Sequence, residues 1–169
     1  MTASGQKQCL WMVAYRPVSP MMWGPMVIRE PEPPGDHLYL DTPYVRILWE
    51  AGGPWMTIEW KAWANSTEYR AAHELLLDAI RERHTPRLLI DASNARVVSL
   101  EDQQWLHTTW IPRAVAAGRR WTAVVMPTSA LVKTIVENID KRPSTNSLVE
   151  IKYFDLIDDA KTWLSTVGH

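Results

Sequence analysis

Apolar residues occupy every second position of residues 45–49 and again of residues 56–60. Such alternation is typical of β-strands that bury one face and expose the other. Residues 51–54 between them read Ala-Gly-Gly-Pro, a composition suited to a tight turn. The pattern therefore predicts an antiparallel hairpin.

Continuous apolar runs appear later in the chain, at residues 88–90 and 121–126. Uninterrupted runs of this length are typical of parallel strands covered on both faces of a sheet. Residues 149–153 return to alternation, which indicates a strand at the edge of the sheet. We therefore expect three further strands after the hairpin.

Three stretches repeat their apolar residues at helical spacing. These are residues 67–84, 129–140 and 156–167. Asn65 and Glu68 form a capping-box pattern at the start of the first. Asp155 is the expected cap of the last, and three amphipathic helices are predicted.

A fourth helix is expected between Ser99 and Gly118. The serine hydroxyl can accept from the free amides of the first turn, and the glycine suits a left-handed position just past the helix end. Pro112 lies inside this helix and cannot donate to the carbonyl of Thr108. A kink or a change of helical register is therefore expected there.

The order strand, strand, helix, strand, helix, strand, helix, strand, helix predicts a single α/β domain. We expect a mixed, mostly parallel sheet opened by the antiparallel hairpin, with four helices, in residues 38–169. Six of the twelve prolines lie in residues 1–37, which predicts an extended tail there. The apolar stretch in the tail is too short to cross a bilayer, so no transmembrane segment is expected.

Composition narrows the classes of function. The 18 basic and 19 acidic residues give a net charge of −1, which argues against a general nucleic-acid binder. A single cysteine, Cys9, cannot form an intramolecular disulfide, and this favours a cytoplasmic location. The five histidines show no metal-ligand spacing, and neither a phosphate loop nor a catalytic triad is apparent. We therefore expect no metal, no cofactor and no enzymatic activity.

Polar residues Asp91, Ser93 and Asn94 lie at the end of the predicted strand at residues 87–91 and directly after it. Open α/β sheets bind ligands beyond the carboxyl ends of their strands, so these side chains are candidate ligand contacts. The alternative is that they form turn hydrogen bonds, as these residue types often do.

The predicted helix after this loop carries Trp105, Trp110 and Arg113. These side chains are candidates for a pocket wall or a protein-binding patch, with Arg113 stacked on an indole. The alternative is an amphipathic helix whose tryptophans cover the sheet. Ser99 completes the candidate set at the start of this helix.

Two motifs suggest a family. The chain reads WxxxxWIPRAxxAG over residues 105–118 and FDLIDDAKTWL over residues 154–164. With the element order, these motifs resemble the STAS-like group of small bacterial proteins, over about residues 38–167. The resemblance implies a mixed sheet with packed helices and a non-enzymatic, regulatory or ligand-binding role.

One position departs from the antagonist members of that group, which carry an Asp-Ser pair whose serine is phosphorylated. Residues 98–101 here read Val-Ser-Leu-Glu, with Leu100 in the position of the phosphoacceptor. A phosphate there would meet the negative charges of Glu101 and Asp102. Ser99 is therefore interpreted as a helix cap, and the serine switch is not expected.

The sequence supports two hypotheses about function. The first is a regulatory or protein-interaction module that uses the loop at residues 93–99 and the tryptophan helix as its contact face. The second is a carrier or sensor of a lipid or other apolar small molecule, held between the sheet and a movable helix. Ten tryptophans and seven methionines motivate the second, since adaptable apolar side chains often line such pockets.

Overall fold

The computed structural model describes residues 35–140 and 148–168, with the backbone alone described for residues 137–140. Residues 1–34, which make up nearly all of the predicted tail, lie outside the described residues. The same holds for the whole of the predicted loop at residues 143–147. The folded domain lies within one compact unit, residues 33–169.

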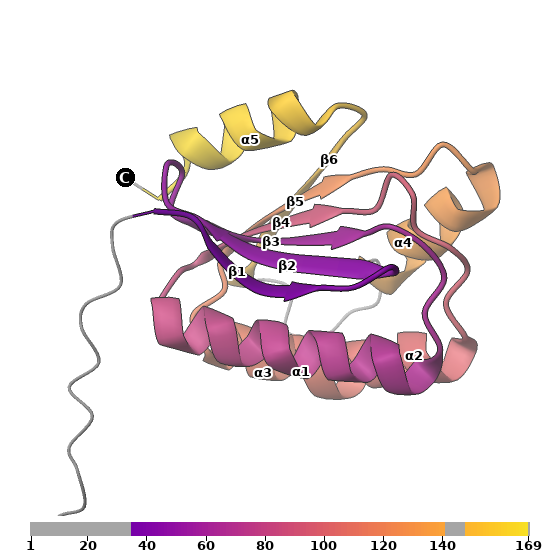
Figure 1. Cartoon of the computed structure of the whole chain (residues 1–169). Coiled ribbons are helices and arrows are strands. Elements are labelled where there is room, and N and C mark those ends of the chain that lie inside the picture. The colour runs from indigo at the N-terminus through magenta and orange to yellow at the C-terminus, as the bar shows by residue number, and fades with distance from the viewer. Residues whose placement is uncertain (1–34, 141–147, 169) are drawn as a thin grey trace, which may run out of the picture. The chain divides into compact units, whose positions relative to one another are not determined.

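A mixed sheet of six strands forms the centre of the domain (Figure 1). The second strand runs antiparallel to its neighbours, the first and the third, and the third to sixth strands are parallel. Their spatial order follows the sequence: β1 (His37–Asp41), β2 (Val45–Glu50), β3 (Trp55–Trp60), β4 (Arg87–Asp91), β5 (Trp121–Val125) and β6 (Glu150–Phe154). The predicted α/β class and mixed sheet are confirmed.

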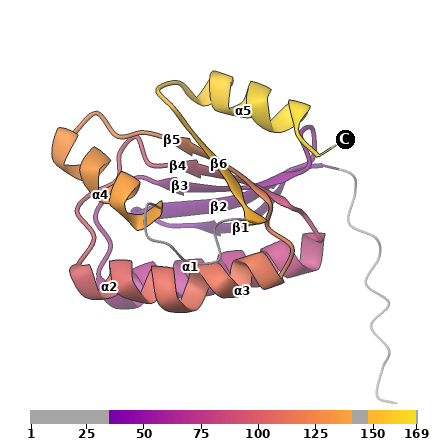
Figure 2. The same cartoon turned by 180° about the vertical axis from the view of Figure 1, so that it is seen from behind.

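Helices lie on both faces of this sheet. They are α1 (Ser66–Arg83), α2 (Leu100–Trp105), η1 (Leu106–Trp110), α3 (Ile111–Ala116), α4 (Ala130–Asp140) and α5 (Ile157–Thr166). Figure 1 shows α1, α2 and α3 on one face and α5 on the other, while Figure 2 shows α4 near the end of β4 and β5. Within the described residues, no helix is long and apolar enough to cross a membrane.

The strand β1 is absent from the predicted order, which begins with the hairpin. Its pairing with β2 shifts register between Leu38 and Leu40, so that Tyr39 is an extra residue on this strand. Tyr39 and Leu40 are consequently both half-buried. The bulge removes the regular alternation by which a short edge strand is recognised in a sequence.

The predicted hairpin is confirmed, with Glu50 opposite Trp55 across the turn. Gly53 lies in this turn, and a Cβ atom there would overlap the ring of Trp55. Because glycine has no Cβ atom, the Trp55 indole can pack directly on the backbone at this position.

The predicted capping box of α1 is also confirmed. The Asn65 side chain accepts from the Glu68 amide at 3.0 Å, and the Glu68 carboxylate accepts from the Asn65 amide at 2.9 Å. The predicted cap of the last helix is wrong. The N-cap position of α5 is Leu156, which makes no side-chain cap bond, so Asp155 precedes it by one residue.

The helix that carries the tryptophans changes type twice, as the position of Pro112 predicts. A π-helical turn, η1, separates α2 from α3, and the amide of Ile111 donates to the carbonyl of Leu106, five residues back. The wider turn accommodates a proline that lacks an amide proton. Gly118 ends the segment with φ of 108°, which confirms its predicted left-handed conformation.

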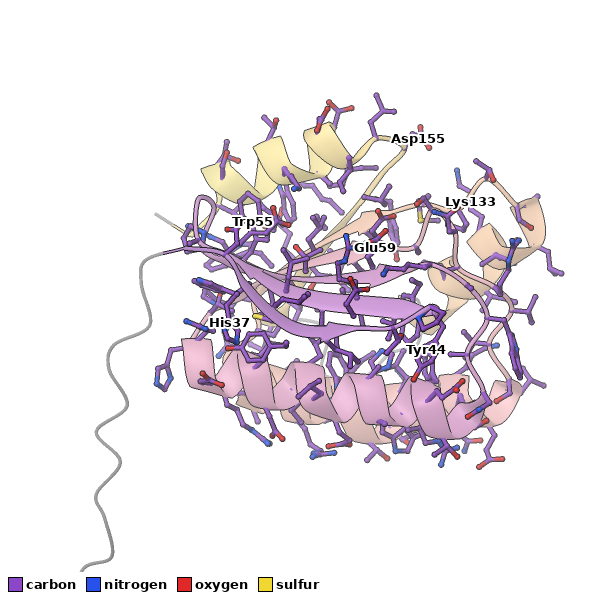
Figure 3. The ribbon with its side chains drawn as sticks, in the orientation of Figure 1. His37, Tyr44, Trp55, Glu59, Lys133 and Asp155 are labelled. Carbon is purple, nitrogen blue, oxygen red and sulfur yellow. The ribbon has the colours of Figure 1, made fainter. Side chains whose placement is uncertain are left out.

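The sheet separates two clusters of buried side chains. Trp55 points toward α5 (Figure 3) and belongs to the cluster on that face. The members of this cluster are Trp55, Leu89, Ala123, Val125, Ala160 and Leu164. The cluster under α1, α2 and α3 is larger, and it includes Ile47, Met56, Ile58, Leu76, Ile80, Leu88 and Trp110.

Candidate functional site

An apolar cavity of about 110 Å³ lies between the sheet and α4, beside α1 and η1. Three parallel strands contribute Ile58, Ile90 and Val124 to its wall. These residues are aligned in the ladder, Ile58 with Ile90 and Ile90 with Val124, so their side chains lie in a row on one face. The opposite wall is formed by α4, with Val132, Ile135 and Val136.

Aromatic rings of four residues form a continuous cluster along one side of the cavity. The ring of Trp60 stacks on Tyr69 with centroids 5.0 Å apart, and Tyr69 lies 4.4 Å from the ring of His73. Trp110 meets His73 edge to face at 5.0 Å. Its indole N–H donates to the backbone carbonyl of His73 at 2.6 Å, which fixes the indole against α1.

Burial keeps the two titratable rings of this cluster uncharged. Removal from water lowers the pKa of His73 from 6.5 to about 4 and raises the pKa of Tyr69. The Nδ1 atom of His73 lies 2.9 Å from the carbonyl oxygen of Tyr69. A carbonyl only accepts hydrogen bonds, so the neutral imidazole carries its proton on Nδ1, and Nε2 is an acceptor.

A buried positive charge, that of Arg119, lies in the cavity wall. Arg119 is 3% exposed, and its guanidinium carbon is 5.8 Å from the centroid of the Trp110 ring. This charge acts with burial to keep the pKa of His73 low, although desolvation is the larger cause. The cavity is therefore mainly apolar and neutral, with a cation on one side.

A buried carboxylate fixes the two loops beside the cavity. The hydroxyls of Ser66 and Ser99 donate to Asp102 Oδ2 at 2.6 and 2.7 Å, and Arg70 Nε donates to Oδ1 at 2.7 Å. Burial raises the pKa of Asp102, but these three hydrogen bonds outweigh it and hold the pKa below its usual value. Ser66 and Ser99 each follow a loop that lines the cavity, so Asp102 holds both loops in place.

The polar residues predicted after β4 form a turn. The Asp91 carboxylate accepts from the Ser93 amide at 3.0 Å, and Asn94 Nδ2 lies 3.5 Å from Ser93 Oγ. Their neighbours Ala92 and Ala95 line the cavity. The structure thus supports the turn interpretation, while placing the loop itself at the cavity.

Ser99 caps α2, as predicted, and accepts from the amide of Asp102 at 3.1 Å. This bond places the hydroxyl at the helix end. The predicted cap is confirmed, and the hydroxyl is also engaged by the Asp102 carboxylate.

The three candidate residues of the tryptophan helix have different surroundings. Trp110 is 2% exposed and lines the cavity, so it does not belong to an outer protein-binding face. Trp105 is half-buried, with the Arg70 guanidinium 5.4 Å from its ring centroid. Arg113 does not make the predicted stacking contact. It pairs with Glu74 through two hydrogen bonds of 2.6 and 2.7 Å, because both side chains project from facing helices.

Two residues of the site, His73 and Arg119, were not predicted from the sequence. His73 falls at helical spacing between Tyr69 and Leu76, on the apolar side of α1, and this position was the available signal. Arg119 follows the glycine that ends the tryptophan helix, and its neighbours along the chain gave no signal of burial. Its place in the cavity wall depends on the packing of distant segments.

The described residues contain no group of three or more His, Cys, Asp or Glu side chains arranged to hold a metal ion. No protein-family model, curated protein or solved structure matches this chain. The resemblance to STAS-like proteins therefore stays a prediction. Function is inferred from the cavity and the side chains around it.

Proposed function

We propose that this domain is a non-catalytic module that binds a small apolar molecule in the cavity between its sheet and α4. The proposal takes up the second of the two hypotheses raised by the sequence. The observation that carries it is the row of Ile58, Ile90 and Val124 facing the apolar side of α4 across about 110 Å³ of space. Close-packed interiors rarely leave such a volume empty without a reason.

The volume limits the size of the ligand. An apolar cavity of about 150 Å³ binds benzene, whereas pockets for drug-sized molecules measure about 300–1,000 Å³. The present cavity is nearer to the first, and suits a single ring or a short hydrocarbon chain. A full-length fatty acid would fit only if α4 moved outward.

The wall chemistry favours binding over conversion. His73 and Tyr69 are both held neutral by burial, and the aromatic cluster offers flat apolar surfaces rather than a proton donor of ordinary pKa. Apolar contact then supplies the binding free energy, at about 25 cal/mol for each Å² removed from water. A regulatory use of the bound ligand is what the STAS resemblance implies.

Titration of the purified chain with toluene and with indole tests this proposal. Saturable changes in amide chemical shifts are expected for cavity residues such as Ile90 and Val124. The variant Val136→Phe places a ring in the cavity and should weaken binding about tenfold or more. Leu131→Phe is the matched control, since Leu131 lies on the same helix but is 64% exposed.

A series of straight-chain carboxylic acids of increasing length tests the lipid form of the proposal. Affinity that rises with chain length and then stops indicates a cavity of fixed size. Affinity that keeps rising with chain length indicates that α4 moves outward to enlarge the cavity. Absence of saturable binding for toluene, indole and every acid overturns the proposed function.

A further inference from the structure

Large apolar side chains are exposed around the mouth of the cavity. Trp63 is 64% exposed, Val97 is 50% exposed, and both line the cavity. Leu131, 64% exposed, precedes the cavity-lining residue Val132 on α4. These side chains come from three separate segments that all follow carboxyl ends of parallel strands, and their exposure has no role in packing.

Positive charge accompanies these residues. Arg96 is exposed in the loop beside Val97 and lines the cavity, and Lys133 is exposed on α4 (Figure 3). Within residues 35–136 and 148–168, neither cation forms an ion pair. Glu101, in the first turn of α2 after this loop, pairs with Arg70 at 2.8 Å. We call Trp63, Arg96, Val97, Leu131 and Lys133 the mouth patch.

We propose that the mouth patch docks the domain on an anionic lipid bilayer. Tryptophan and aliphatic side chains insert at the boundary between headgroups and acyl chains, while Arg and Lys remain among the phosphates. Membrane docking needs only this combination of exposed apolar groups and exposed cations. A protein partner would need a larger shaped surface, typically about 800 Å² on each side.

The direction of approach follows from the charges on the two faces of the sheet. Asp155, Asp158 and Asp159 at the start of α5 follow β6, so they lie at the same ends of the parallel strands as the mouth patch, but beyond the face opposite α1. Anionic headgroups repel these carboxylates, so we expect the docked domain to tilt its α4 side toward the bilayer and the start of α5 away from it. The inference rests on the proposed function in one respect: an apolar ligand then passes between bilayer and cavity without crossing water.

Flotation of the full chain with vesicles tests the docking. Vesicles of phosphatidylcholine alone are compared with vesicles that also contain phosphatidylglycerol. Binding is expected on the anionic vesicles, and it should weaken as salt is raised. Lys133→Glu should lower it about fivefold or more, since a charge near an anionic surface is worth about that factor.

The contribution of the exposed apolar side chains to vesicle binding is tested with a matched pair of leucines, Leu131 and Leu148. Leu131→Ser should lower vesicle binding severalfold, whereas Leu148→Ser should leave it unchanged. Leu148 is 59% exposed but precedes β6, so it lies at the opposite ends of the parallel strands. Trp63→Ser should produce the largest fall. Attachment through any other segment would leave Trp63→Ser, Leu131→Ser and Lys133→Glu equal to the unmodified chain, and that result overturns the proposal.

Failure of docking and failure of ligand binding can be told apart. Neither Leu131 nor Lys133 lines the cavity, so their variants should bind toluene normally. Vesicle binding without toluene binding supports the docking and rejects the proposed function. Equal affinity for neutral and anionic vesicles overturns the docking proposal. No binding to either kind of vesicle overturns it as well, and would indicate that the mouth patch binds a protein partner instead.

Discussion

The two faces of the sheet are built from the same strands but are filled differently. Neighbouring residues Leu88 and Leu89 of β4 are both fully buried, one in the cluster under α1 and the other in the cluster under α5. The α5 cluster has small side chains at its centre, Ala123 and Ala160, which allow the helix to approach closely. The buried members of this cluster are at most 6% exposed, and none of them lines the cavity on the other face.

The face under α1 is filled at one end and hollow at the other. Leu77 and Ile80, in the second half of α1, are fully buried near the amino ends of the parallel strands. Toward the carboxyl ends, a loop and α4 replace close helix packing, and the cavity opens there. A hollow thus arises where a helix does not lie directly on the sheet, which is also where open α/β sheets bind ligands.

The largest expected difference between the two faces is in how much the free energy of unfolding falls when a buried side chain is truncated to alanine. Leu164→Ala in the α5 cluster should lower the free energy of unfolding by about 2–5 kcal/mol, because it leaves a new cavity in a filled core. Ile135→Ala should cost about 1 kcal/mol or less, because Ile135 already borders empty space and is half-buried. Urea unfolding measures both. Equal losses would show that the cavity wall is packed as tightly as the other core.

The aromatic cluster beside the cavity gives the next effect, a dependence of stability on pH. The folded pKa of His73, about 4, lies below its usual 6.5. Between these values the unfolded chain binds a proton that the folded chain does not, so stability falls as pH is lowered from 6.5 to 4. At about 1.4 kcal/mol for each pKa unit, the fall reaches about 3 kcal/mol.

Urea unfolding of the unmodified chain and of His73→Phe across this pH range isolates the effect. The variant keeps an aromatic ring but has no group to protonate, so its stability should fall less steeply between pH 6.5 and 4. Asp102 does not enter this range, since its lowered pKa affects stability only as pH falls below about 4. The same slope in both proteins would place the titration elsewhere.

Most of the scaffold follows from local patterns in the sequence. The strand run at residues 88–90, the capping box at Asn65 and the left-handed Gly118 each depend on a few neighbouring residues. Such features were predictable because backbone geometry and first-turn hydrogen bonds are decided locally. The bulged strand β1 and the start of α5 were missed because a one-residue shift removes those local signals.

The cavity was not predictable in the same way. The pattern of residues 129–140 identified an apolar face of α4, but it did not show how closely that face approaches the sheet. Val132 is buried, whereas Ile135 is half-buried and Leu131 is exposed. Amphipathicity indicates which side of a helix turns inward, and packing between distant segments decides whether the space behind it is full.

A smaller effect is expected in the hairpin turn, where the α5 cluster reaches its edge. Gly53→Ala should lower stability by about 1–3 kcal/mol, because the added methyl group must displace the buried Trp55 ring. Gly52→Ala is the neighbouring control, since nothing lies within 4 Å of its added Cβ atom. Thermal unfolding of both variants checks the difference. A Gly53→Ala protein as stable as the Gly52→Ala protein would show that Trp55 has room to move.

The smallest expected change in stability comes from substitutions at two adjacent residues of β5. These substitutions compare the two faces of the sheet most directly. Val124 faces the cavity and Val125 faces α5, and each is 3% exposed. Val125→Ile adds a methylene to a filled cluster and should cost about 1 kcal/mol or more. Val124→Ile adds the same group to empty space, so it should stabilise the fold by up to about 1 kcal/mol and weaken toluene binding. Because strand, burial and chemical change are shared, a difference of sign between the two variants can come only from the space on each face.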